Sequence, residues 1–153
     1  MFVSIGNSRM DKKFNCTDMT YEDLVSRLSK TKHTAETMEQ YRKMPKGQQD
    51  NIKDVGGFVL GKLKGGRRKK DCVISRSAIT LDMDYGTQGI IDELEMFFDM
   101  KMVVYSTHKH TTEKPRLRLL IPLDRSVSAE EYEAISRKVA EEIGIDQFDD
   151  TTY

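Results

Sequence analysis

Two aspartates stand two residues apart inside an apolar run, in the sequence ITLDMDYG at residues 79–86. Aspartate is depleted in strands, and a buried carboxylate is costly without a partner, so Asp82 and Asp84 face either water or something cationic. Side chains alternate across a strand, which puts both aspartates on one face, about 7 Å apart. Paired carboxylates suit hard divalent cations such as Mg²⁺. The spacing therefore predicts a cation site on a sheet surface.

Two further polar pairs repeat the same spacing. Ser106 and His108 lie in the next β-rich run, and Arg116 and Arg118 lie in the run after it. If these strands are neighbours, we expect the pairs to meet the aspartates on one open sheet face. Basic and histidine donors would hold a triphosphate there, beside divalent ions that promote phosphoryl transfer. The set favours metal-dependent nucleotidyl transfer over a Ser-His-Asp triad, because nothing marks Ser106 as an activated nucleophile.

The elements that position these residues follow the order strand, helix, strand, strand, helix. We expect strands at 72–85, 101–110 and 116–123, and helices at 87–100 and 128–144. The first two strands, joined by a helix, are predicted to run parallel through a right-handed crossover, and the next two to form a hairpin near Pro115. The pattern predicts an α+β fold with an RRM-like or ferredoxin-like mixed sheet built on a βαββα core.

Residues 1–55 predict a helical N-terminal segment, in which residues 2–8 could add a short strand. Thr20 is a candidate helix N-cap, and a second helical stretch at 34–44 stops before Pro45. This segment carries no motif that predicts chemistry.

Composition limits the function classes. The 153 residues contain 25 Lys+Arg and 25 Asp+Glu, so the net charge is zero and a globally basic nucleic-acid binder is not indicated. Cys16 and Cys72 make no metal spacing and favour a reduced protein. No stretch approaches the roughly 20 apolar residues of a membrane span, so the cytoplasm is the expected location.

One segment is locally basic despite the balanced total. Six of the ten residues at 61–70 are basic, among them Arg67, Arg68, Lys69 and Lys70. Such a run is either a solvated loop or a flexible arm that contacts phosphates, and the sequence leaves both interpretations open. Its spacing is not that of a P-loop, which would end in Gly-Lys-Ser/Thr.

Three motifs in fixed order resemble the archaeo-eukaryotic primase superfamily. Asp82-Met83-Asp84 matches its D-x-D motif, Ser106-Thr107-His108 its s-x-H motif, and Phe148-Asp149 its hydrophobic residue followed by an acid. The similarity looks closest to the primase-polymerase domains of phage and mobile-element replication proteins, often labelled virulence-associated protein E. It covers residues from about 56 to the C-terminus, so we expect the catalytic core at 56–153.

The resemblance implies a DNA primase/polymerase that adds nucleotides on a DNA template. Asp82, Asp84 and Asp149 would ligate two Mg²⁺ or Mn²⁺ ions, and Ser106 and His108 would bind the phosphates of an incoming NTP or dNTP. The basic run at 67–70 would help to hold the template. Family members continue beyond this point and often carry a helicase domain, so the core looks truncated after Tyr153. Asp124 and Asp150 are alternatives to Asp149 as the third acid.

Two other functions stay open. A Rep-type replication-initiator endonuclease would use a His-hydrophobic-His motif, which HKH at 108–110 resembles loosely, with Tyr132 or Tyr153 as nucleophile. A non-catalytic nucleic-acid-binding module would bind single strands by aromatic stacking on its sheet, but the predicted exposed strand faces carry acids instead.

Overall fold

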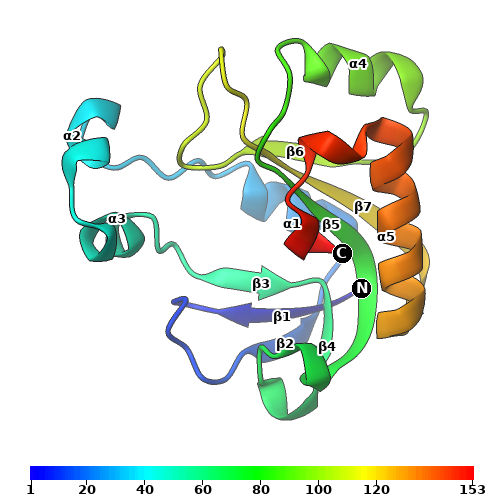
Figure 1. The fold of residues 1–153 in the computed structure, drawn as a ribbon. Coiled ribbons are helices and arrows are strands. Elements are labelled where there is room, and N and C mark those ends of the chain that lie inside the picture. Colours follow the sequence, from blue (N-terminus) through cyan, green and yellow to red (C-terminus); the bar gives the residue numbers. More distant parts are fainter.

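The computed structural model describes all of residues 1–153 and contains two antiparallel sheets and five α-helices (Figure 1). The strands are β1 (Phe2–Gly6), β2 (Asn15–Asp18), β3 (Gly57–Val59), β4 (Gly61–Leu63), β5 (Val73–Met83), β6 (Val103–Ser106) and β7 (Leu117–Val127). The α-helices are α1 (Tyr21–Leu28), α2 (Met38–Lys43), α3 (Lys46–Ile52), α4 (Ile90–Phe97) and α5 (Ala129–Ile143). Short 3₁₀ turns are η1 (Lys64–Gly66), η2 (Lys70–Cys72), η3 (Ile145–Gln147) and η4 (Asp150–Thr152).

The larger sheet has the strand order β4-β5-β7-β6, and every neighbouring pair is antiparallel. The predicted succession of strand, helix, strand, strand, helix is confirmed as β5, α4, β6, β7 and α5, and so is the hairpin of β6 with β7. The condition under which the polar pairs would meet, that β5 and β6 are neighbours, is not fulfilled. These two strands run in the same direction, but β7 lies between them and takes the backbone hydrogen bonds of both, so the sheet is antiparallel instead of mixed.

The two faces of the larger sheet are covered differently. On one face, Ile79, Leu81 and Met83 of β5 pack with residues of α4 and α5 in the main hydrophobic core. On the other face, Ala78 and Leu120 pack against β1 and α1 in a smaller cluster. The expectation of a wholly open second face is therefore wrong, because the small sheet and α1 cover its middle. The end of this face near Asp82 remains part-exposed.

Residues 1–55 are not a purely helical segment, which corrects the sequence-based expectation. They contain α1, α2 and α3, but they begin with β1 and β2, which form a three-stranded sheet in the order β2-β1-β3. Thr20 caps α1 as predicted, through a capping box with Asp23. Figure 1 shows α2 and α3 standing apart from the central sheet.

The helix after the hairpin follows its sequence signals closely. Ser128 caps α5, with its side chain bonded to the backbone of Glu131 and the Glu131 side chain bonded back to the cap, an arrangement that stabilises a helix by about 1 kcal/mol. Gly144 ends the helix at a φ of +128°, a conformation that favours glycine. The helices of the structure include none that is both long and apolar enough to cross a bilayer.

Candidate functional site at one end of β5

Three polar side chains lie abreast across the sheet where β5 ends. The register places Asp82 opposite Arg118 and Arg118 opposite Tyr105, so all three share one face. Arg118 binds the Asp82 carboxylate through two hydrogen bonds. Its Nε donates to Oδ1, and its Nη2 donates to Oδ2 at 3.0 Å. Tyr105 meets the same guanidinium through its hydroxyl at 3.4 Å. The row is a two-point arginine–carboxylate pair with an aromatic flank.

Burial and charge act together on this row. Burial alone lowers the pKa of Arg118, but the hydrogen bonds and charges of Asp82 and Tyr105 outweigh it and raise that pKa above its ordinary value. Burial also raises the pKa of Tyr105, with a smaller contribution from the Asp82 charge. Arg118 therefore stays a cation and Tyr105 a neutral phenol at any physiological pH.

Asp84 has its own arginine, one step beyond the row. Arg116 Nη1 lies 3.0 Å from Asp84 Oδ2, and both side chains are about one-third exposed. Lys109 lies in the β6–β7 loop, and its pKa is lowered, first by burial and then by repulsion from Lys46, Lys53 and Arg116. Lys109 therefore lies close enough to Arg116 and Asp84 to feel the charge of both.

His108 is held by the segment before α2 and not by the aspartates. Its Nε2 lies 3.5 Å from Glu36 Oε1 and 3.4 Å from Thr34 Oγ1, and its ring packs on Tyr41 with the centroids 4.4 Å apart. Nδ1 is buried and has no hydrogen-bond partner. The pKa of Glu36 is lowered, first by the hydrogen bond that it accepts from Thr34. The charge of His108 makes a smaller contribution in the same direction. No hydrogen bond or ion pair joins His108 to Asp82 or Asp84, so the predicted meeting of these side chains is not seen.

Ser106 lies on the opposite face from Asp82, which corrects the expectation that the two converge. It pairs with Leu117, and its neighbour Tyr105 takes the Asp82 face. The alternation of side chains along β6 makes this unavoidable once Tyr105 is opposite Arg118. Ser106 instead lines a cavity of about 650 Å³ that also includes Leu94 of α4.

Asp149 reaches the site through its backbone. Its N–H donates to the Asp82 carbonyl at 2.9 Å, while Phe148 is buried in the main core. The Asp149 carboxylate turns toward Thr151, where the backbone N–H and then the hydroxyl lower its pKa. Asp124 stands six residues from Arg118 along β7, about 20 Å away at the strand rise. Of the three alternatives, Asp149 alone is bonded to the backbone of Asp82.

The carboxylates have the chemistry of a Mg²⁺ or Mn²⁺ site but not its arrangement. Oxygen donors of this kind suit hard divalent ions. However, no group of three or more His, Cys, Asp or Glu side chains is placed to hold a metal ion. Asp82 and Asp84 are bound by arginines, and Asp149 faces Thr151. As they lie, these residues do not fit a two-metal site.

A family model decides the relationship that the motifs suggested. The model described as VapE N-terminal domain matches residues 1–153, the whole chain. The chain belongs to the VapE N-terminal domain family. This agrees with the resemblance to VapE-like replication proteins of phages and mobile elements. No curated protein and no solved structure matches the chain.

The basic run of this VapE N-terminal domain lies at the far end of β5 from Asp82. Arg67, Arg68, Lys69 and Lys70 are exposed in the turns that follow β4, while the β6–β7 loop lies at the other end of the strand (Figure 1). Eleven residues of β5 separate the two regions, about 33 Å at the strand rise. The run therefore does not belong to the constellation around Asp82.

The two tyrosines considered as endonuclease nucleophiles have structural contacts. The Tyr132 hydroxyl accepts from the Thr80 N–H at 3.2 Å, donates to the Thr80 carbonyl at 3.0 Å, and accepts from Arg76 at 2.9 Å. The Tyr132 hydroxyl thereby binds backbone groups of β5 at a point that the short strand β4 does not reach. Tyr153 packs on the main core, and the Arg137 guanidinium lies 5.0 Å from its ring centre. Neither arrangement presents an activated tyrosine beside a histidine pair.

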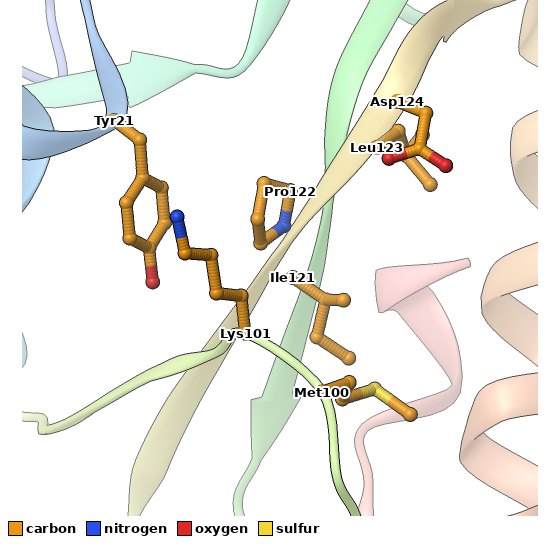
Figure 2. Close-up of a pocket in the computed structure, with 7 residues that line it drawn as sticks. All are labelled: Tyr21, Met100, Lys101, Ile121, Pro122, Leu123 and Asp124. Atoms are coloured by element: carbon orange, nitrogen blue, oxygen red, sulfur yellow. The ribbon is translucent and has the colours of Figure 1, made fainter.

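Two depressions of the VapE N-terminal domain lie along β6 and β7, and neither is lined by Asp82 or Asp84. One, of about 360 Å³, runs beside β7 from Tyr21 and Lys101 to Asp124, as Figure 2 shows. The Lys101 amine lies 5.3 Å from the centre of the Tyr21 ring. The other depression, beside α4, includes Ser106 and His110. Asp124 thus belongs to a different surface from Asp82.

Sequence reasoning missed four residues around the site: Glu36, Tyr41, Tyr105 and Lys109. Tyr105 could have been found from the alternation along the β6 run, because it precedes Ser106 and so must share the face opposite to it. Glu36 and Tyr41 carry no such signal. They come from the N-terminal segment, and only the tertiary structure places them on His108.

Proposed function

We propose that this VapE N-terminal domain takes part in template-directed nucleotide addition during phage or mobile-element DNA replication, as a primase-polymerase-type nucleotidyltransferase. One observation carries the proposal: Asp82, Asp84 and Asp149 gather at one end of β5, where Arg116 and Arg118 face the first two. The position of β7 between β5 and β6 also agrees with an RRM-like core, in which the third strand of the βαββα unit lies between the first two.

The cations of the site suit the phosphates of an NTP or dNTP. Guanidinium groups bind phosphate oxygens with two parallel hydrogen bonds, as Arg118 already binds Asp82. Lys109, whose pKa is lowered first by burial and then by the neighbouring cations, adds positive charge beside Arg116 that attracts an anion. Mg²⁺ or Mn²⁺ is the cofactor proposed for the carboxylates, which must first leave their arginines.

Template DNA is the proposed macromolecular ligand, and the exposed basic run is its proposed contact. Because β5 extends about 33 Å from this run towards Asp82, the template strand would have to follow the length of β5. A helicase, as a further domain or a separate protein, is the proposed partner that supplies single-stranded template.

Two assays test the proposal directly. They are primer extension and dinucleotide synthesis, each run with Mn²⁺ and with either NTPs or dNTPs. Asp82→Asn and Asp84→Asn keep the side-chain shape and remove the charge, and we expect each to lower synthesis about a hundredfold or more. Asp92→Asn, at an exposed aspartate of α4, makes the same charge change away from the site and should leave synthesis unchanged.

Binding of a fluorescent nucleotide with Mn²⁺ provides a second readout for the same variants. A wild-type chain that neither synthesises nor binds nucleotide would contradict the proposal, and so would synthesis that the asparagine variants leave intact.

A passive nucleic-acid-binding role is the second candidate, and the ion pairs favour it. Asp82 and Asp84 have arginine partners already and need no metal ion to offset their charge. This role predicts salt-sensitive DNA binding that Asp82→Asn does not change, without any nucleotide synthesis. The same two assays therefore separate the candidates.

A further inference from the structure

The basic run at 67–70 lies against a second basic segment that is distant in the sequence. The turn that leads into the run contacts the end of the β1–β2 loop, where the Phe14 N–H donates to the Gly66 carbonyl at 2.8 Å. Lys12 and Lys13 directly precede Phe14 in this loop. Figure 1 shows β2 close to β4 at this end of the molecule. The fold therefore holds the loop lysines and the basic run together.

A glycine at position 66 makes this close approach possible. Gly66 has a φ of +70°, a conformation that side chains rarely adopt. A Cβ on this residue would collide with the Phe14 carbonyl and would lie 2.9 Å from Lys13 Cγ. Its neighbour Gly65 has a similar φ of +60°, but a Cβ there would meet nothing within 4 Å. The contact between the two segments thus depends on Gly66, whereas Gly65 serves the turn alone.

The exposed cations of the two segments form what we call the composite basic surface, which consists of Lys12, Lys13, Lys64, Arg67, Arg68 and Lys69. None of these six side chains forms an ion pair, and the next residue of the run, Lys70, lies 3.9 Å from Glu133. Of the neighbouring acids, Asp71 is exposed and Asp11 binds backbone N–H groups of its own loop. The surface therefore carries an excess of positive charge, which attracts a polyanion.

Cations cover the rings of Phe14 and Phe2 beside the composite basic surface. Phe14 is 1% exposed, and the Arg68 guanidinium lies 5.7 Å from its ring centre. The Lys62 amine lies 3.5 Å from the ring centre of Phe2. Proteins that bind single strands combine such cations with free aromatic faces on which bases stack. The composite basic surface offers cations without such faces, so it suits the phosphate backbone and not the bases.

We propose that the composite basic surface binds the phosphate backbone of double-stranded DNA, irrespective of base sequence. A duplex has two backbones and therefore more phosphates along its length than a single strand, so cations that lack stacking partners favour it. This inference rests on the proposed function, because nucleotide addition on a template produces a duplex that the domain then holds. It assigns the duplex to this surface and adds Lys12, Lys13 and Lys64 to the contact proposed for residues 67–70.

Fluorescence anisotropy with a labelled duplex and with one of its strands alone tests the inference. Lys12→Ala with Lys13→Ala should weaken duplex binding about tenfold at low salt and lower the salt slope by about 0.9 for each lost phosphate contact. Lys30→Ala with Lys32→Ala removes the same charge after α1 and should do neither. The unmodified protein should bind the duplex more tightly than the single strand, and should bind two duplexes of unrelated sequence equally.

A pair of glycine variants tests the geometry without any change of charge. Gly66→Ala should separate the two segments and weaken duplex binding about threefold. Gly65→Ala adds the same methyl group at a similar φ but meets open space, so it should weaken binding much less. Circular dichroism melts check that both variants fold. If Gly66→Ala does not fold, the two double-lysine variants decide the question.

Three results overturn the inference: equal losses in the two double-lysine variants, a single strand that binds at least as tightly as the duplex, or phosphatidylserine vesicles that bind as tightly as the duplex through Lys12 and Lys13. The last result would assign the surface to a membrane. Failure of the proposed function is distinguishable. If the loop lysines govern duplex binding but no nucleotide synthesis is detected, the duplex surface stands and the proposed function fails. If synthesis depends on Asp82 while duplex binding does not depend on the loop lysines, this inference alone fails.

Discussion

The two ends of β5 carry charge in opposite ways. Near Val73, the basic run at 67–70 is exposed, and its ion pairing is limited to Lys70 and Glu133 at 3.9 Å. Near Met83, Asp82 and Asp84 are each paired with an arginine of the neighbouring chain segment. A net charge of zero therefore conceals one end whose cations are largely free and one end whose charges neutralise each other.

This difference separates two kinds of anion binding. Free cations attract any polyanion, and their effect falls with salt. Paired arginines respond only to a ligand that can replace a carboxylate, so they discriminate more. The comparison predicts that the basic end governs affinity for nucleic acid, whereas the acidic end governs which small ligand is accepted.

The largest expected effect comes from a side chain that supports β5, the strand that joins the two ends. Tyr132→Phe removes a hydroxyl that bonds both the N–H and the carbonyl of Thr80 and also receives Arg76. Leaving these part-buried groups without their partner should lower the free energy of unfolding by about 2 kcal/mol. Urea denaturation followed by circular dichroism measures the change.

The Tyr132 variant also tests the endonuclease interpretation independently. If the wild type forms a covalent adduct with DNA and a stably folded Tyr132→Phe variant does not, Tyr132 is the nucleophile. Its hydroxyl then has a role beyond its structural hydrogen bonds. Tyr153→Phe is the control, because the Tyr153 ring packs on the core and faces Arg137. It should form no less adduct than the wild type.

The basic end provides the next largest expected effect. Arg67→Ala with Lys69→Ala should weaken binding of a single-stranded oligonucleotide about tenfold at low salt. The slope of log affinity against log salt should also fall, by about 0.7 for each lost phosphate contact. Fluorescence anisotropy over a salt series measures both quantities.

Two exposed lysines of the N-terminal segment provide the matched control. Lys30→Ala with Lys32→Ala removes the same charge from the region after α1 and should change the salt slope little. Asp82→Asn should leave DNA affinity unchanged. Equal losses in the two double variants would show that net charge, and not the basic end, sets the affinity.

Local signals in the sequence predicted much of the fold. The N-cap at Thr20, the helix expected at 128–144, the apolar alternation along β5 and the β6–β7 hairpin depend on neighbouring residues, and all are seen. The order of strands in the sheet does not depend on them. Whether β7 lies between β5 and β6 is decided by packing over the whole domain, so the crossover alone could not reveal it.

The candidate site shows the same division. The placement of Asp82 and Asp84 away from the main core followed from alternation, and the alternative that they face something cationic was visible in the chain. The identity of their partners was not, because it depends on the register that sets Asp82 opposite Arg118. The prediction placed Ser106 on the wrong face for a related reason. It used the spacing between Ser106 and His108 without knowledge of the register of β6.

The smallest expected effect concerns a surface pair at the basic end of the sheet. The pKa of Glu131 is lowered from 4.5 to about 2. The hydrogen bond from Arg125 is the largest cause, and the hydrogen bond from the Ser128 backbone is the next. A carboxylate with a depressed pKa stabilises the fold fully above its unfolded pKa, and that contribution is lost as pH falls through the folded pKa. The wild type should therefore lose Tm more steeply than Glu131→Gln between about pH 5 and pH 2.

Thermal melts across this pH window check the sign as well as the size of the effect. Glu130→Gln, at the exposed neighbour of Glu131 in the first turn of α5, is the control for simple charge removal near the helix N-terminus. Its melting curve should keep the slope of the wild type at low pH. A Glu131→Gln protein whose Tm falls as steeply as that of the wild type would show that the Arg125 pair and the cap add nothing in solution.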